Sequence, residues 1–431
     1  MIFSTALLSV WPKYATASDF LGVLLDLFDE FETPGQVHPI QLRIAILVST
    51  WTSTSFDRDF RCNKPALTLL KVFHSTLVLL TSSTNSNATH ATSLVRYTNL
   101  IGDKLFPRLS EPPLKHRQEY NSTLVDSEIT PTIFQTIRPK SQSWCEAFLA
   151  IDSASIAAQL TYLESRIFCA IDPYDLFVNA GSCKWDKVGM ESRRDVLSTV
   201  DTSVGHFNFV SAWVITRVLM GRKPKSRAKM IHKFIQIALE LKSINNFNTL
   251  MSVISGLTST PIDRLKQTQT LLQQQHLYSD GRDSNPTLFD AIRDLERLMS
   301  QEKLFSRYRK ALTDAPCPCI PYLGVITRDL IYIEEGNKDV LSPTGEVNLS
   351  KAVMIADIVL TIQWYQDRPH QIQRDHGVLG MILESTALTT EQAYALSLEL
   401  EPRQVDSVEV VEKVALGKKN SGFPFQGKFK F

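Results

Sequence analysis

Apolar side chains recur at intervals of three and four residues along the first eighty positions of the chain. This spacing places them on one face of a helix, so it predicts three amphipathic helices whose stripes form a core rather than a binding surface. Thr33-Pro34-Gly35 separates the first helix from the second. The three stripes consist of Phe20, Val23, Leu24, Leu27, Phe28 and Phe31; of Ile40, Ile44, Leu47, Val48 and Trp51; and of Leu67, Leu70, Val72, Phe73, Leu77 and Leu80.

The same periodicity returns after residue 151 and continues over most of the remaining chain. It predicts further helices near residues 154–168, 210–219, 230–241, 286–299 and 351–366. Between the two periodic regions, residues 81–91 are rich in Ser, Thr, Asn and Ala, and prolines follow at 112, 113, 131 and 139. This composition is typical of a connection. We therefore predict modules over 1–80 and 151–403, a partly structured linker over 81–150, and a tail over 404–431.

One segment departs from the helical pattern. Residues 325–333 read Val-Ile-Thr-Arg-Asp-Leu-Ile-Tyr-Ile, a run of β-branched and aromatic residues. Propensity alone predicts a strand there.

Composition supports a helical, neutral protein. Glycine contributes 17 of 431 residues, about half of the usual ~7%, which disfavours a Rossmann fold and an all-β sandwich because both use glycine in tight turns. The formal net charge is +1, so no nucleic-acid partner is expected. No run of eighteen uncharged apolar residues occurs, and no membrane-spanning helix is expected.

The common catalytic motifs are missing from the sequence. It contains no phosphate-binding Gly-x-x-x-x-Gly-Lys-Ser/Thr, no His-Glu-x-x-His and no Gly-x-Ser-x-Gly. The six cysteines are too sparse for a disulfide scaffold, and Cys317-Pro318-Cys319 has no second pair to complete a zinc site. We therefore expect no metal, no cofactor and no enzymatic chemistry. A triad whose members meet only in the fold stays open.

The N-terminus has two interpretations. Residues 1–10 are mostly apolar, and Ala15-Thr16-Ala17 matches the small-x-small pattern of signal cleavage. No basic residue precedes the apolar stretch, and Pro12 with Lys13 interrupts it. An ordinary helix is therefore favoured, and a secreted helical protein stays as a distant alternative.

Several dense strings occur in a fixed order in the second half of the chain. They are Ile156-Ala-Ala-Gln-Leu160 with Glu164, His206-Phe-Asn208 with Trp213, Ile244-Asn-Asn-Phe-Asn-Thr-Leu250, Phe305 with Tyr308, Pro318-Cys-Ile-Pro-Tyr-Leu-Gly324, Asp329-Leu-Ile-Tyr-Ile-Glu-Glu-Gly-Asn337, Val347-Asn-Leu-Ser-Lys351 and Glu399-Leu-Glu-Pro-Arg403. This set resembles the catalytic domain of Ras-type guanine-nucleotide exchange factors, the family of Son of sevenless. Residues 18–80 resemble part of that family's N-terminal exchanger module, without its first helices.

The resemblance implies an all-α fold in which Tyr322 to Glu335 form the first helix of a protruding hairpin, against their own propensity. In relatives this hairpin enters the GTPase between its switch regions. Ile331 then approaches the Mg²⁺ site and Glu335 takes the place of a phosphate, so these two are the expected catalytic residues. Tyr322, Leu323, Asn248 and Asn208 are expected to bind the GTPase.

Each site residue also has a structural interpretation: Glu335 as part of a turn, Ile331 as hairpin core, and Tyr322 as packing. Thr327 and Arg328 depart from the apolar and small residues usual in the family, and Ala352-Val353-Met354 replaces a basic run. These changes allow altered partner choice or reduced activity.

The prediction from the sequence is a non-enzymatic regulator. It is expected to promote GDP release from a Ras-family GTPase in the cytoplasm and to reach the inner face of a membrane through that lipidated partner. The alternative is a catalytically inactive helical scaffold. The individual GTPase and the oligomeric state stay open.

Overall fold

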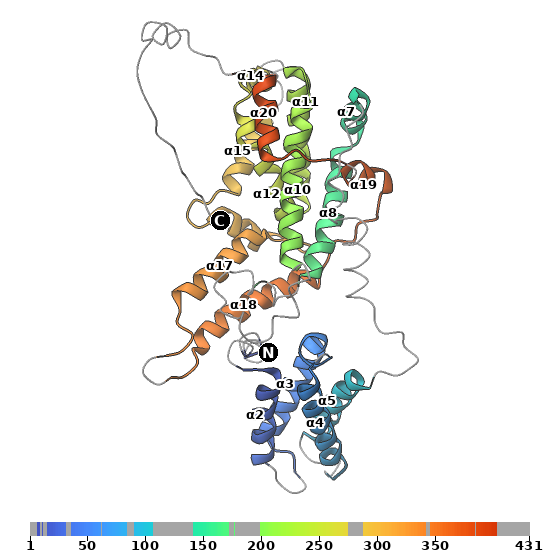
Figure 1. Cartoon of the computed structure of the whole chain (residues 1–431), viewed down its shortest axis with the longest axis vertical. Coiled ribbons are helices and arrows are strands. Elements are labelled where there is room, and N and C mark those ends of the chain that lie inside the picture. Colours follow the sequence, from blue (N-terminus) through green and yellow to red (C-terminus); the bar gives the residue numbers. More distant parts are fainter. Residues whose placement is uncertain are drawn as a thin grey trace, which may run out of the picture.

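The computed structural model describes residues 7–8, 11, 15–31, 36–61, 63–83, 90–106, 141–171, 176, 199–274, 288–341, 345–383 and 385–402. Within these ranges the regular elements are helices, and the only β pairing consists of two isolated bridges. Buried apolar residues form two separate cores, one from the N-terminal helices and one from the helices after residue 141. The predicted all-α class is confirmed (Figure 1).

The N-terminal helices form a small bundle. They are α2 (Ala17–Glu30), α3 (Pro39–Phe56), a short π-helix (Asp57–Arg61), α4 (Lys64–Ser83) and α5 (Ala91–Leu105). Most of each predicted stripe lies inside, including Phe28, Leu70 and Phe73. Val23, Leu27 and Val72, which we also predicted on these faces, are exposed. Trp51 is also buried, and its indole nitrogen donates to Asp59 Oδ2 at 2.8 Å. The three helices predicted from hydrophobic periodicity are therefore present.

Helix α5 lies inside the stretch that we predicted as a linker. It packs against α3 and α4 through the buried residues Leu94, Thr98 and Ile101. Those three residues share one helix face, and burying them completes the bundle core. Residues 91–105 of the predicted partly structured linker therefore form a helix that packs with the N-terminal bundle. Residues 107–140 lie outside the described part of the chain.

Helix α4 is long and apolar enough to meet a membrane-span criterion, which the sequence pattern did not lead us to expect. Ala66, Leu70, Phe73 and Leu77 pack in the core of the bundle, however. The core helix of a bundle meets the same criterion, so length and composition alone are weak support for a span.

The larger body contains the remaining helices. These are α7 (Ser141–Ala150), α8 (Ser153–Ala170), α10 (Thr199–Leu219), α11 (Pro224–Ser243), α12 (Phe247–Leu257), α13 (Thr260–Asp263), α14 (Lys266–Gln274), α15 (Leu288–Leu298), α16 (Ser306–Asp314), α17 (Leu323–Gly336), α18 (Leu349–Gln366), α19 (His376–Leu383) and α20 (Thr390–Leu400). Helix α10 is central and packs against α8, α11, α12 and α20. Phe148, Trp213 and Phe234 meet in its core at edge-to-face and tilted angles.

A buried ion pair joins the end of α20 to this body. Arg227 Nη2 lies 2.7 Å from Glu401 Oε1, and the same carboxylate accepts from Thr268 Oγ1 and from the amide of Gln267. Burial alone would raise the pKa of Glu401, but the hydrogen bonds from Thr268 and Arg227 outweigh it and lower the pKa. The Leu-Glu-Pro-Arg string thus closes the fold. Arg403 lies outside the described residues.

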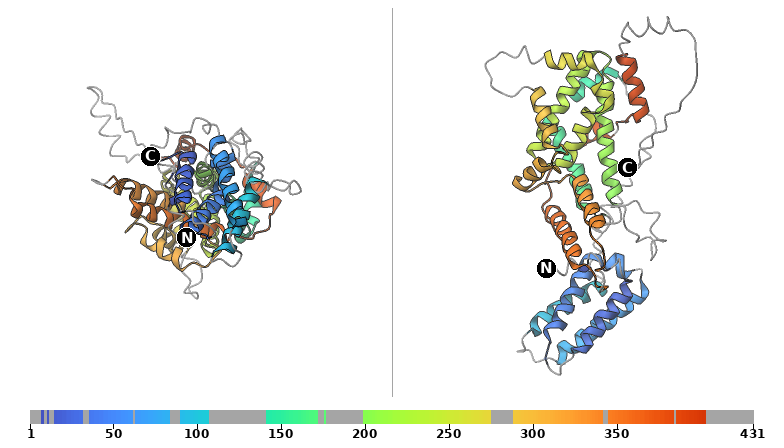
Figure 2. Two further views of the ribbon diagram at one scale, coloured as in Figure 1. Left: turned by 90° about the horizontal axis from the view of Figure 1, so that it is seen from below. Right: turned by 90° about the vertical axis from the view of Figure 1, so that its left-hand side faces the viewer.

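Helices α17 and α18 form a hairpin that extends from the body (Figures 1 and 2). The segment that propensity assigns to a strand is α17. Leu323, Val325 and Leu330 are buried on it, and α18 faces it with Ala352, Ile355 and Ala356. Propensity differences are small beside the burial of such a face, so tertiary packing decides the conformation. The helix implied by the family resemblance is confirmed.

Candidate functional site

The first turn of α17 is held by side chains from two other helices. The amide of Tyr322 donates to the hydroxyl of Tyr308 at 2.7 Å, and the amide of Leu323 donates to Asn248 Oδ1 at 3.2 Å. A helix leaves its first amides without internal partners, and no cap from the Tyr322 side chain is present. Tyr308 of α16 and Asn248 of α12 therefore supply the cap and fix where the hairpin begins.

A buried carboxylate stands behind this cap. Glu164 on α8 is fully buried, and its Oε1 accepts from Asn248 Nδ2 at 2.9 Å. Its Oε2 lies 2.9 Å from His206 Nδ1 and accepts from Thr249 Oγ1 at 3.3 Å. We call Glu164, His206, Asn248 and Thr249 the base network. It connects α8, α10 and α12 to the start of α17, so the hairpin is anchored to the centre of the body.

Aromatic rings surround the same point. The Tyr322 ring stacks on Phe207 with centroids 6.0 Å apart, and Phe305 lies 6.1 Å away at a tilted angle. Burial raises the pKa of the Tyr322 hydroxyl above its usual value. A Cβ on Gly324 would lie 2.5 Å from the Tyr322 ring, so only glycine lets the ring fold over α17.

Phe305 reaches this group from an unusual turn. Lys303, Leu304 and Phe305 all have positive φ, at 48°, 57° and 60°. Such conformations cost free energy in residues other than glycine. The turn buries Phe305 to 4% exposure and leaves Leu304 61% exposed. Together with Val204, which is 50% exposed on α10, Leu304 borders the aromatic group with accessible apolar surface.

The outer face of α17 carries a mixed stripe. Arg328, Ile331, Tyr332 and Glu335 follow each other at three- and four-residue spacing, which places them on one side. The Arg328 guanidinium lies 4.7 Å from the Phe305 ring centre and 5.6 Å from that of Tyr332. Glu335 is exposed, and within the described residues its carboxylate takes part in no ion pair.

The six predicted site residues thus divide into three groups. Glu335 and Asn208 are exposed, Tyr322 and Ile331 are half-buried, and Leu323 and Asn248 are buried. In this structure the Asn248 amide is engaged with Glu164 and with the α17 backbone and offers no group to a partner. We predicted Asn248 as a GTPase-binding residue, but it is buried at the start of the hairpin. The sequence alone does not indicate this burial. Glu164, Phe305 and Tyr308 belong to the motif strings, but no role for them follows from the strings alone.

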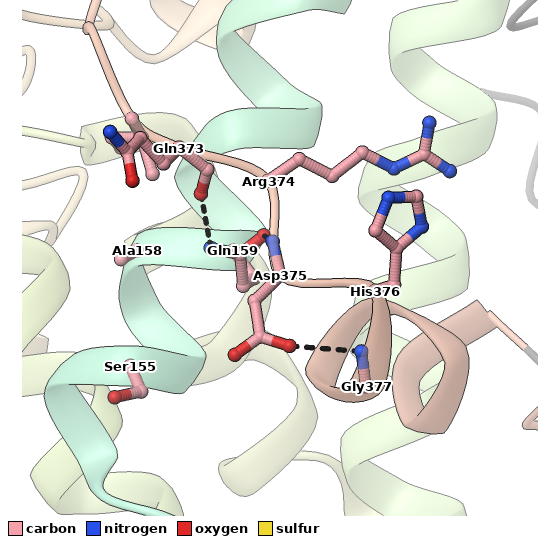
Figure 3. Close-up of a pocket in the computed structure, with 9 residues that line it drawn as sticks. Ser155, Ala158, Gln159, Gln373, Arg374, Asp375, His376 and Gly377 are labelled. Atoms are coloured by element: carbon pink, nitrogen blue, oxygen red, sulfur yellow. Dashed lines mark hydrogen bonds between the residues drawn. The ribbon is translucent and has the colours of Figure 1, made fainter.

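An open pocket of about 600 Å³ lies elsewhere, between the first turns of α8 and the segment leading into α19. Several of its polar groups pair with each other (Figure 3): Gln159 pairs with Gln373 O and with the Asp375 amide, and Asp375 caps α19 at Gly377. These bonds fasten a loop to the body. Among the described residues no group of three or more His, Cys, Asp or Glu side chains is arranged to hold a metal ion.

Comparison with known proteins identifies similar chains. Residues 155–353 match the RasGEF domain. Ras guanine nucleotide exchange factor J of Dictyostelium discoideum is 27% identical over 421 residues, covering 95% of this chain and 47% of the relative. Factor K of the same organism is 34% identical over 253 residues, covering 58% and 15%.

A vertebrate protein is also similar. The Ras-specific guanine nucleotide-releasing factor 2 of Danio rerio is 32% identical over 259 residues, covering 60% of this chain and 19% of the relative. The chain spans less than half the length of each of these three relatives.

Proposed function

Because this chain belongs to the Ras guanine-nucleotide exchange factor family, we propose that it accelerates the release of GDP from a Ras-family small GTPase. In this proposal the α17–α18 hairpin enters between the two switch regions of the GTPase. The chain makes no covalent change in its partner. It binds the GTPase in a form whose nucleotide site is open, so nucleotide and exchange factor weaken each other's binding. Each tenfold loss of nucleotide affinity requires ~1.4 kcal/mol of differential binding.

The outer face of α17 supports the catalytic part of the proposal. Ile331 brings an apolar side chain towards the Mg²⁺ site, and Mg²⁺ requires oxygen ligands in near-octahedral geometry. Glu335 brings a carboxylate to the phosphate subsite, where it competes for the same charge-assisted hydrogen bonds. The exposure of Glu335, without an ion pair among the described residues, is the single observation that carries this assignment.

The aromatic group at the hairpin base supports the binding part. Tyr322 and Phe207 are half-buried, and Val204 and Leu304 beside them are accessible. Apolar surface of this kind, next to an exposed amide such as Asn208, fits a partner's apolar switch segment. We propose that this base surface grips the second switch of the GTPase while the tip acts in the nucleotide site.

The wider assignments are proposals as well. Residues 151–403 are the catalytic unit, and residues 18–80 brace it as a partial exchanger module. The protein acts in the cytoplasm and reaches the inner face of a membrane through its lipidated GTPase. Fractionation of cells that express either the lipidated GTPase or a lipid-deficient variant tests the last point. We expect the chain in the membrane fraction only with the lipidated GTPase.

One observation favours the alternative, a scaffold that binds a GTPase without releasing nucleotide. The outer face of α18 carries Val353 and Met354, 37% and 36% exposed, at positions where the family resemblance leads us to expect basic residues. A loss of charge beside the hairpin is compatible with binding that does not open the nucleotide site.

The deciding experiment measures release of fluorescent GDP from a panel of Ras, Rap and related GTPases. We expect acceleration with at least one member, and loss of about 100-fold in Glu335→Ala and in Ile331→Ala, because each removes a group that acts only in the opened site. Glu399→Ala on α20 is the control: it removes the same charge from an exposed position far from the hairpin.

Each outcome has a clear meaning. Binding to nucleotide-free GTPase without acceleration across the panel supports the scaffold. Acceleration that survives both alanine variants contradicts the assignment of Ile331 and Glu335 but leaves exchange activity in place.

A further inference from the structure

A single lysine connects the two helices of the hairpin near its tip. Lys351 is the third residue of α18, and its side chain is only 3% exposed. Its ammonium lies 2.7 Å from Glu334 Oε2 and 2.7 Å from Asp339 Oδ1. It also donates to two backbone carbonyls, of Asn337 at 3.0 Å and of Glu334 at 3.2 Å. The cation is therefore surrounded by acceptors from the end of α17 and the turn that follows.

This position is costly for a lysine. A cation in the first turn of a helix faces the positive end of the helix dipole. Removing an ammonium from water also costs several kcal/mol unless other charges and hydrogen bonds compensate. Here two carboxylates and two carbonyls do so. The contacts satisfy carbonyls that the last turn of α17 leaves without helical partners.

The turn around the lysine is closed by further bonds. The amide of Asn348 donates to Asp339 O at 2.8 Å, and its side chain donates to Lys338 O at 3.0 Å. The Asn337 side chain donates a hydrogen bond to Ile333 O, one turn back on α17, at 3.0 Å. Each of these bonds ends on a backbone carbonyl. Lys351, in contrast, also binds a side chain of α17, that of Glu334.

That side chain is the neighbour of the proposed catalytic carboxylate. Glu334 and Glu335 are adjacent, so their side chains leave the helix about 100° apart. Glu334 is 7% exposed and bound to Lys351, whereas Glu335 is exposed. Holding Glu334 inward fixes the rotation of the last turn and with it the outward direction of Glu335.

We infer that Lys351 is a positioning residue for exchange: by binding Glu334 and the last carbonyls of α17, it decides which of two adjacent carboxylates the hairpin presents to the nucleotide site. The inference rests on the proposed function, since it assigns Lys351 to the same site. In this proposal Lys351 contacts neither the GTPase nor the nucleotide, and it acts only by holding the tip of the hairpin.

The test compares wild type with Lys351→Met, which keeps most of the apolar stem and removes the ammonium. We expect the maximal rate of GDP release to fall at least about tenfold, because a small misplacement of an acting group is costly. The GTPase concentration at half-maximal rate should change less than about twofold, because the base surface is untouched. Lys351→Arg should recover part of the rate. Lys338→Met, an exposed lysine of the same turn, is the control.

A double variant separates positioning from stability. Lys351→Met leaves Glu334 buried without its cation, whereas Lys351→Met with Glu334→Met replaces the pair by apolar side chains, a change that is often neutral for stability. We expect the double variant to regain the melting temperature but not the rate, since the carbonyl contacts stay lost. Recovery of both would show that Lys351 only stabilises the fold and would overturn the inference.

Hydrogen–deuterium exchange provides a readout that does not depend on GTPase activity. In Lys351→Met, amides of residues 334–341 should exchange faster, while those of residues 320–327 stay as in wild type. Unchanged protection at the tip contradicts the inference even if wild type is an active exchange factor. Conversely, if wild type accelerates release from no GTPase, the proposed function fails while this measurement still decides whether Lys351 holds the tip.

Discussion

The base and the tip of the α17–α18 hairpin are fixed in different ways. At the base, α17 begins on a hydroxyl from α16 and an amide from α12, and the amide is oriented in turn by Glu164 of α8. At the tip, α17 ends on the ammonium of Lys351, which belongs to the hairpin itself. The base therefore depends on the packing of the whole body, and the tip depends on its own partner helix.

Because of this difference, substitutions at the base and at the tip should have different effects. The base network lies among helices that also form the core. A change there should therefore affect both folding and the surface that we propose binds the GTPase. The tip is joined to the core only through the length of α17 and α18, so a change there affects the acting groups while folding and binding persist. The hairpin can therefore be tested one end at a time.

The largest effect is expected from Glu164→Ala at the base. The substitution leaves the donors of Asn248, His206 and Thr249 without their acceptor inside the body. We expect the free energy of unfolding to fall by about 3–5 kcal/mol, because each buried donor left without an acceptor costs roughly 1–3 kcal/mol. Chemical denaturation measures it.

Glu164→Gln serves as the matched control, because it keeps one oxygen for Asn248 and should cost less than alanine. A loss below about 1 kcal/mol for the alanine variant contradicts the view that the base network anchors the hairpin to the core.

Gly324→Ala should affect binding more than folding. The added methyl group would meet the ring of Tyr322 at 2.5 Å, so the ring must leave its stack on Phe207. We expect the GTPase concentration at half-maximal rate to rise by about five- to tenfold, the loss of an aromatic contact of roughly 1–1.5 kcal/mol. The maximal rate should persist, because the tip is unchanged. Stopped-flow release of fluorescent GDP separates the two quantities.

Gly22→Ala on α2 is the control, since a methyl group there meets nothing within 4 Å. If Gly324→Ala instead lowered the maximal rate at unchanged half-saturation, base and tip would not be separable in the way that their contacts indicate.

The sequence identified the tip more completely than the base. Ile331 and Glu335 belong to one contiguous string, and helical spacing puts them on one side of α17. Asn248 was found in the same manner, but its burial depends on Glu164, which is distant in sequence and opposite it only in the fold. A motif string indicates that a residue such as Asn248 is important. Whether its side chain faces solvent or a buried carboxylate depends on contacts between helices that are distant in sequence.

The fold shows the same limit. The β-branched residues of α17 predict a strand by propensity, and only burial of Val325 and Leu330 against the body decides for a helix. The spacing of Leu94, Thr98 and Ile101 was readable as a helix face. The polar residues before it and the prolines after it predict a linker by composition, and they obscure this short periodic run.

The smallest effect is expected from Arg328, which lies between the two ends. Its guanidinium contacts Phe305 at the base and Tyr332 further along α17, and cation–π contacts of this exposure contribute about 0.5–1 kcal/mol each. Nε and Nη2 have no hydrogen-bond partner, since Arg309 occupies both carboxylate oxygens of the neighbouring Asp329. Arg328→Thr should therefore leave the melting temperature within about 2 °C and change exchange by about two- to fivefold.

The direction of that change is more informative than its size. Arg328 Nη2 lies 4.0 Å from Asp329 Oδ1, a longer ion pair than the one that Arg309 makes with the same carboxylate. This weakly held guanidinium favours GTPases with an acidic residue opposite it, so the variant should lose most activity on that member of the panel and little on the others. Arg307→Thr on α16, where the arginine is exposed and lies outside the aromatic group, removes the same charge as a control. Equal losses for both variants across the panel would mean that net charge alone acts. A loss confined to one GTPase in Arg328→Thr would place partner selection between the anchored base and the acting tip.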